Sequence, residues 1–245
     1  MSTTLLKNKI VGFAKHVLHR TRSLLFLKSS RKHQFSKIFH AGGFGASPSL
    51  SGSGSDLEQT RAIRARLPEL LRKYDITSML DVPCGDWYWM RHVDLSGIQY
   101  TGADIVPELV AMNREKFSNP SRTFNALDIV KDDIPVVDLV FCRDCLVHLK
   151  LKDARQALRN IASSGSKYLL TTTFTARTAN EELGLIFFRP LNLQKPPFSL
   201  PEPIEIISEE CTENDGAFRT SLWRCGVSRT FELKYFDDTT RSLSL

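Results

Sequence analysis

The feature that most constrains the fold is a pair of short, strand-like segments that each end in an acid. Residues 78–82 are apolar enough for a buried parallel strand and run directly into a tight turn around Gly85. A second such segment, residues 99–104, ends in Asp104, about 20 residues after Asp81. This spacing is typical of a βαβ unit in which the second acid hydrogen-bonds a ribose.

The chemistry of the first turn indicates which nucleotide fits. A dinucleotide site uses several glycines, so that bare backbone N–H groups can approach a pyrophosphate at a helix N-terminus. Here Pro83 removes a donor, and Asp86 puts a carboxylate where the phosphates would lie. NAD, FAD and ATP therefore fit poorly. S-adenosylmethionine (SAM) fits well, because it carries adenosine, an ammonium and a sulfonium but no phosphate.

The same residues carry a resemblance to a known family. Residues 79–86 and 100–104 resemble motif I and the acidic second strand end of class I SAM-dependent methyltransferases. Pro83-Cys84-Gly85-Asp86 with Trp89-Met90, the run CRDCLVHL at 142–149 and Arg189-Pro190-Leu191-Asn192 resemble a bacterial-type subgroup of unknown substrate. The resemblance spans roughly Gly52 to Arg224. It implies a Rossmann-like α/β fold with a seven-stranded, mostly parallel sheet and a C-terminal antiparallel hairpin.

Three residues are expected to hold the methionine and ribose parts of SAM. Asp81, at the carboxyl end of the first strand, is expected to hold the ammonium, directly or through water. Gly85 lets the backbone approach the methionine moiety, because a Cβ there would intrude. Asp104 is expected to accept hydrogen bonds from both ribose hydroxyls. The alternative for the first two residues is an ordinary turn.

Three further residues complete the expected cofactor site. Asp86 is expected beside the cofactor, and Asp128 resembles the family position that binds the adenine amino group, although an Asp at a strand end is also common turn chemistry. Trp87, Tyr88 and Trp89 follow the turn, and an aromatic face attracts a sulfonium. The resemblance favours Trp89 as the ring near the site, while at least one of the others is expected to pack in the core.

The segment 142–148 leaves the fourth strand, whose end faces the transferring methyl group in this fold, and it has three interpretations. Cys142 and Cys145 have no second pair at a spacing suitable for zinc, so no metal site is predicted. A redox pair lacks the thioredoxin pattern, and two buried small hydrophobic residues explain the cysteines better. In the third interpretation Asp144 and His148 are a catalytic pair, with His148 as the base. The alternative is a His148 that packs or caps the following helix.

The remaining pattern predicts one α/β domain with an extension. We expect strands at 78–82, 99–104, 122–127, 137–142 and 167–173, helices at 56–74, 86–94, 107–117 and 152–163, and a hairpin made by 204–208 and 222–224. The expected organisation is a basic amphipathic leader at 1–40, a Gly/Ser-rich loop at 41–55 and the methyltransferase domain at 56–245.

The charge of the chain is concentrated in the leader. The net charge is +6, but nine basic side chains and no acid precede Asp56. The domain itself therefore lacks the basic groove of a nucleic-acid binder. The leader suits peripheral contact with an anionic membrane, a targeting segment, a solvated tail or an ordinary cap helix, and no segment is long enough to span a bilayer. We expect deletion of 1–40 to leave cofactor binding intact.

The predicted function is SAM-dependent transfer of a methyl group to an oxygen of a small-molecule or glycan-like acceptor. Five cysteines without regular spacing indicate a reducing, cytoplasmic compartment. The alternatives are a non-catalytic binding module tethered at a membrane and a nucleotide-linked oxidoreductase. The sequence does not indicate the oligomeric state.

Overall fold

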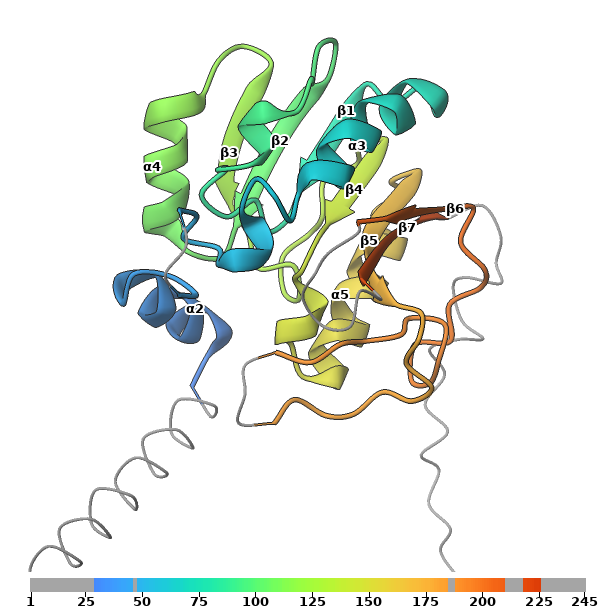
Figure 1. Cartoon of the computed structure of the whole chain (residues 1–245). Helices are drawn as coiled ribbons and strands as arrows, with labels where there is room; N and C mark the ends of the chain where they lie inside the picture. The colour runs from blue at the N-terminus through green and yellow to red at the C-terminus, as the bar shows by residue number, and fades with distance from the viewer. Residues whose placement is uncertain (1–28, 46–47, 185–187, 210–217, 226–245) are drawn as a thin grey trace, which may run out of the picture.

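The computed structural model describes residues 29–45, 48–184, 188–209 and 218–225 of the 245-residue chain. Within these residues seven strands form one sheet in the order β3-β2-β1-β4-β5-β7-β6 (Figure 1). Strands β1 to β5 are parallel to one another, and β7 is antiparallel to both β5 and β6. The predicted Rossmann-like fold with its C-terminal antiparallel hairpin is confirmed.

The element bounds follow the predicted alternation closely. The strands are β1 (Ser78–Asp81), β2 (Gln99–Asp104), β3 (Arg122–Ala126), β4 (Leu139–Cys142), β5 (Tyr168–Phe174), β6 (Glu205–Ser208) and β7 (Phe218–Arg224). The α-helices are α2 (Arg31–His40), α3 (Arg61–Lys73), α4 (Pro107–Phe117) and α5 (Leu151–Ser163), and short 3-10 turns occupy η1 (Ser53–Ser55), η2 (Met90–His92) and η3 (Leu146–His148).

Two apolar layers hold the helices against the sheet. On one face, the side chains of α3 pack with alternate strand residues such as Met79 and Phe141. On the other face, those of α5 pack with the intervening residues, such as Leu80 and Val140. Neighbouring strand residues point to opposite faces, so strands buried on both sides are continuously apolar. The sheet is therefore the middle layer of a three-layer α/β/α domain.

Two expected helices differ from the structure. The predicted helix at 86–94 is wrong, because the chain makes turns there and has only η2 at Met90–His92. Gly85 and Trp87 both have positive φ angles, 54° and 56°, which an α-helix does not accommodate. The helix expected from residue 56 begins at Arg61, because the Asp56 carboxylate accepts the N–H of Gln59 and closes a separate turn.

The described residues 29–45 and 48–55, here called the N-terminal arm, lie across one end of the sheet. Figure 1 shows α2, in blue, near the lower end of α4 and beside α5. Phe35 packs against the apolar layer that contains α5, and His40 Nε2 lies 3.7 Å from Glu108 Oε1 of α4. The arm therefore packs against the domain rather than extending away from it.

Candidate active site

A cavity lies at the carboxyl ends of β1, β2 and β4, where the strand order reverses between β1 and β4. Open α/β sheets bind their ligands at this switch point. The strand ends and the arm form its opposite walls. From the strand ends and the turns that follow come Asp81, Gly85, Trp89, Asp104, Asp128, Arg143, Asp144 and His148, and from the arm Arg31, Phe35, Ile38, Phe39, Phe44, Leu50 and Ser51.

Asp81 is the most deeply buried carboxyl group in this cavity, with 3% of its surface exposed. Burial raises its pKa to about 8, although the Tyr100 hydroxyl opposes the shift by donating to Asp81 Oδ2 at 2.5 Å. Asp104 adds to the rise as a neighbouring acid. A cation that binds here would favour the ionised form and lower this pKa again.

Asp104 links the two strand ends. Its carboxylate accepts the backbone N–H of Gly85 at 3.3 Å and that of Val106 at 3.0 Å. Burial raises the Asp104 pKa to about 6, and these two donors limit the rise. Gly85 has φ of 54°, and a Cβ there would lie 2.1 Å from Ser51 Oγ of the arm. The turn therefore requires glycine both for its backbone angle and for the close packing of the arm.

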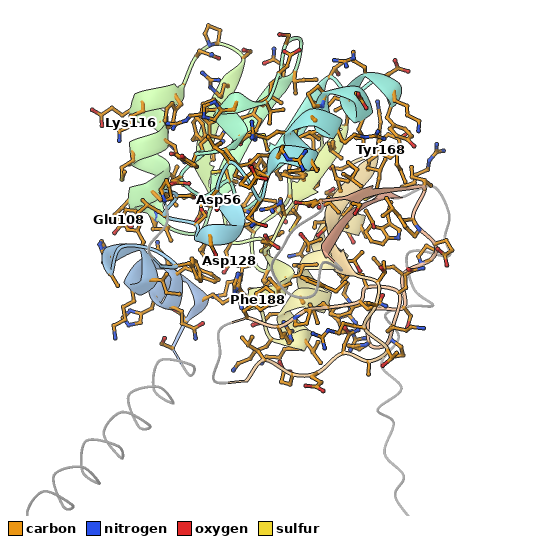
Figure 2. All side chains as sticks on the ribbon, viewed as in Figure 1. Asp56, Glu108, Lys116, Asp128, Tyr168 and Phe188 are labelled. Carbon is orange, nitrogen blue, oxygen red and sulfur yellow. The ribbon has the colours of Figure 1, made fainter. Side chains whose placement is uncertain are left out.

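Asp128 follows β3 and lies at the other end of the cavity, beside α2 (Figure 2). It is held by Arg31, whose Nη2 donates to Oδ2 at 2.9 Å and to Oδ1 at 3.2 Å. Arg31 Nη1 also reaches Asp153 Oδ2 at 3.1 Å, at the start of α5. The predicted adenine-binding residue is therefore paired with a cation from the N-terminal arm.

The tryptophans that follow the turn separate into two roles. Trp89 lines the cavity, packs edge-on against Phe141 and lies 5.6 Å from the Arg143 guanidinium. Trp87 lies in the core, where its ring contacts Phe117 and Phe124. Trp89 is thus the ring of this pair that can face a bound sulfonium.

Asp86 does not line the cavity. Its Oδ1 accepts the hydroxyl of Ser49 at 2.9 Å, and its Oδ2 accepts the N–H of Leu50 at 2.8 Å. Both oxygens therefore bind the N-terminal arm. Asp86 thus supports the cavity through Ser49 and Leu50, whereas the sequence predicted that it would lie beside the cofactor. No α-helix lies between β1 and β2, where residues 82–98 are all described, so the turn also lacks the helix N-terminus that binds a pyrophosphate.

Asp144 follows β4 and lines the cavity in a conformation rare for a non-glycine residue, with φ of 54°. Its N–H donates to Thr172 Oγ1 at 3.0 Å, and its carboxylate lies 3.1 Å from Arg143 Nη1. Arg143 is buried and also binds Glu209 at 2.9 Å. One quarter of the Asp144 side chain stays exposed, so its carboxylate remains accessible from the cavity.

His148 ends the η3 turn and lies on the same cavity. Its ring is 5.1 Å from that of Phe44 and 5.8 Å from that of Phe188, between centroids. Arg189 fixes the turn by donating to the carbonyls of Val147 at 3.0 Å and Leu149 at 2.5 Å. In the sequence Arg189 appeared only within a run that carries the family resemblance, whereas in the structure it fixes the turn that carries His148.

The cysteines of this region are buried and free. A hydrogen bond with Cys142, together with burial, raises the pKa of the Cys145 thiol well above its usual range, so the thiolate form is disfavoured. Among the residues that the structure describes, no group of three or more His, Cys, Asp or Glu side chains is arranged to hold a metal ion.

The arm residues of the cavity were missed by sequence reasoning, which assigned 1–40 to a separate leader. The structure places α2 against the cavity, so deletion of 1–40 would remove part of its wall, contrary to our expectation. The signal that was available is the spacing of Phe35, Ile38 and Phe39, at i, i+3 and i+4 on one helix face. The apolar residues that suggested an amphipathic leader, Leu6 to Leu25, lie outside the described residues.

Comparisons with known proteins agree with this geometry. A family model described as a methyltransferase domain matches residues 80–164. The comparison with curated proteins gives no match. Among solved structures, the chain is similar to the N-methyltransferase NodS of Bradyrhizobium japonicum WM9 in complex with S-adenosyl-L-homocysteine, with 13% identity and a TM-score of 0.54 over 78% of this chain and 97% of that one. It is also similar to human N-acetylserotonin methyltransferase with SAM, with 15% identity and a TM-score of 0.48 over 79% and 66% of the two chains.

The fold and the matched domain define the class of enzyme as SAM-dependent methyltransferase, with SAM as the cofactor. The residues present fit this cofactor. Asp81, Asp104 and Asp128 offer carboxylates for an ammonium, ribose hydroxyls and an amino group, and the turn after β1, where a dinucleotide fold binds its pyrophosphate, leads into no α-helix. The predicted enzyme class and cofactor are thus confirmed, while the role of each residue remains a prediction.

Proposed function

We propose that the chain transfers the methyl group of SAM to an oxygen atom of a small-molecule or glycan-like acceptor. The observation that carries the proposal is the position of Asp144 and His148. Both line the cavity that holds Asp81 and Asp104, and both follow β4, the strand next to β1. The carboxylates that suit the cofactor and a candidate base thus share one space.

The chemistry divides between the cofactor and this chain. SAM supplies an electrophilic methyl group on a sulfonium sulfur. Asp81 would hold the ammonium, Asp104 the ribose and Trp89 the sulfonium. His148 would take the proton that an acceptor hydroxyl loses as its oxygen bonds to the methyl carbon, since imidazole titrates nearest neutral pH. Asp144 would orient the hydroxyl, and Arg189 is a positioning residue that fixes the His148 turn.

Isotope transfer tests this proposal. The purified chain would be incubated with SAM labelled in the methyl group and a panel of sugars, hydroxylated metabolites and amines, and products read by mass spectrometry. With an accepted substrate, His148→Gln should lower kcat by about 100-fold or more while leaving SAM affinity unchanged. The matched control is His92→Gln, because His92 is exposed on η2, away from the cavity.

Each outcome decides part of the proposal. Unchanged turnover in His148→Gln would show that His148 is not the general base. A product methylated on nitrogen would contradict the proposal that the acceptor atom is oxygen. An oxidoreductase would instead bind NADH, which the turn after β1 disfavours because it carries no helix N-terminus. Full binding of SAM without turnover on any acceptor would favour the binding module.

We also propose that the basic leader contacts an anionic membrane surface from a cytoplasmic, reducing compartment. Support comes from α2, whose outward side chains Lys32, His33, Lys37 and His40 are exposed while Phe35 and Phe39 line the cavity. No helix in the described part of the chain is long and apolar enough to cross a membrane. The full chain should pellet with anionic but not zwitterionic vesicles, and equal pelleting with both would contradict the proposal.

A further inference from the structure

Arg31, the first residue of α2, carries a buried donor that has no partner among the described residues. Its Nη1 and Nη2 bind Asp153 and Asp128, but its Nε is buried and makes no hydrogen bond to any residue that the structure describes. A buried donor left unpaired is unfavourable, so such atoms commonly mark a position that a ligand or water completes. Arg31 lines the cavity assigned to SAM, which makes the cofactor the natural partner for this atom.

The Arg31–Asp128 pair presents a donor and an acceptor close together. Nε and Nη2 belong to one planar guanidinium, and Nη2 is the group that binds Asp128. Asp128 Oδ1 accepts from Arg31 and from the N–H of Val130, whereas Oδ2 accepts, within the described part of the chain, from Arg31 alone. A carboxylate oxygen accepts two hydrogen bonds, so Oδ2 retains one acceptor position.

Adenine has the complementary pattern along one edge. On its Watson–Crick edge the exocyclic amino group donates, and the ring nitrogen N1 beside it accepts. A 6-oxopurine reverses this pattern, because a carbonyl oxygen replaces the amino group and would face the carboxylate, while N1 carries a hydrogen that would face the Arg31 Nε–H. The pair is therefore suited to distinguish an aminopurine from its oxo counterpart.

We propose that Arg31 is a base-reading residue of the cofactor site, whose Nε–H donates to N1 of adenine while Asp128 accepts from the amino group. This rests on SAM as cofactor and on the predicted role of Asp128. It assigns a recognition role to the N-terminal arm, which lies outside the matched methyltransferase domain at 80–164. The competing explanation is that Arg31 only fastens α2 to Asp128 and Asp153.

Calorimetry with a pair of ligands separates these explanations. S-adenosylhomocysteine and its 6-oxo analogue, S-inosylhomocysteine, would be titrated into the full chain and into Arg31→Met and Arg31→Lys. Lysine keeps a cation for Asp128 but has no equivalent of Nε. The matched control is Arg66→Met, because Arg66 is exposed on α3 and pairs there with Glu69.

The preference for adenine is the decisive quantity. We expect the wild-type chain and Arg66→Met to prefer the adenine ligand by about 100-fold, and both Arg31 variants to lose about tenfold of that preference. Equal weakening of both ligands, or an unchanged preference, would show Arg31 to be only a fastener and overturn the inference. No binding of S-adenosylhomocysteine to the wild-type chain would overturn the cofactor assignment together with it.

Discussion

The two walls of the cavity are built in different ways. The strand-end wall comes from β1, β2 and β4, whose backbones are tied together in one parallel ladder, and its buried polar groups are the carboxyls of Asp81 and Asp104 and the guanidinium of Arg143. The N-terminal arm is held instead by side-chain contacts, namely the Arg31 ion pairs, the Phe35 packing and the Asp86 hydrogen bonds. On our proposals the first wall supplies the binding chemistry, while the second encloses and selects the ligand.

The largest effect should come from the strand-end wall. Asp104→Ala should weaken SAM binding by about 100-fold, because two charge-assisted hydrogen bonds to the ribose are lost. A loss of about tenfold is the smallest effect consistent with the assignment. Calorimetry measures the affinity, and Asp94→Ala, at an exposed turn, is the control. Unchanged affinity would show that Asp104 does not bind the ribose. It would also contradict the claim that the strand-end wall contributes more to SAM affinity than the N-terminal arm.

Removal of the arm should have the next largest effect. Deletion of residues 1–45 takes away α2 and its aromatic side chains, and we expect SAM affinity to fall about 30-fold through lost apolar burial. The folded state of the truncated chain is checked by circular dichroism and thermal unfolding. If the folded truncation binds SAM as tightly as the full chain, the arm contributes nothing to the site.

Proton release sharpens the comparison, because it reports on the strand-end wall alone. The Asp81 pKa is about 8 in the free protein, so this carboxyl is mostly protonated at pH 7. An ammonium bound beside it should release about one proton, visible as calorimetric heats that depend on the buffer. Release should fall as the pH rises through 8. Asp81→Asn should abolish this proton release. Equal release in the variant would show that the proton comes from a group other than Asp81.

The smallest effect is expected at the contact between the walls. Asp86→Ala removes acceptors for Ser49 and Leu50 but no group that lines the cavity, so SAM affinity should fall only about threefold. Hydrogen exchange at Leu50 should rise in parallel. A loss of tenfold or more without faster exchange would restore the direct cofactor contact that the sequence suggested.

The strand-end wall was predictable because its signals are local. An apolar strand, a turn and an acid lie within a few residues of one another, so Asp81, Gly85 and Asp104 could be located before any tertiary contact was known. The helix expected at 86–94 failed for a local reason as well, since two positive φ angles at Gly85 and Trp87 convert it into turns.

The arm could not be predicted in the same way. Arg31 meets Asp128, 97 residues further along the chain, and Ser49 meets Asp86 across 37. No spacing rule connects such residues, because their proximity follows from how α2 packs on the completed sheet. The Gly/Ser-rich composition of 41–55 indicated a loop but not where it would return.

Titration of the full chain with S-adenosylhomocysteine and, separately, with NADH tests the central claim most directly, namely that the ends of β1 and β2 form a SAM site. We predict micromolar binding of the first ligand, weakened by Asp104→Ala, and no heat with NADH. Absence of S-adenosylhomocysteine binding, or binding that Asp104→Ala leaves unchanged, would contradict the claim.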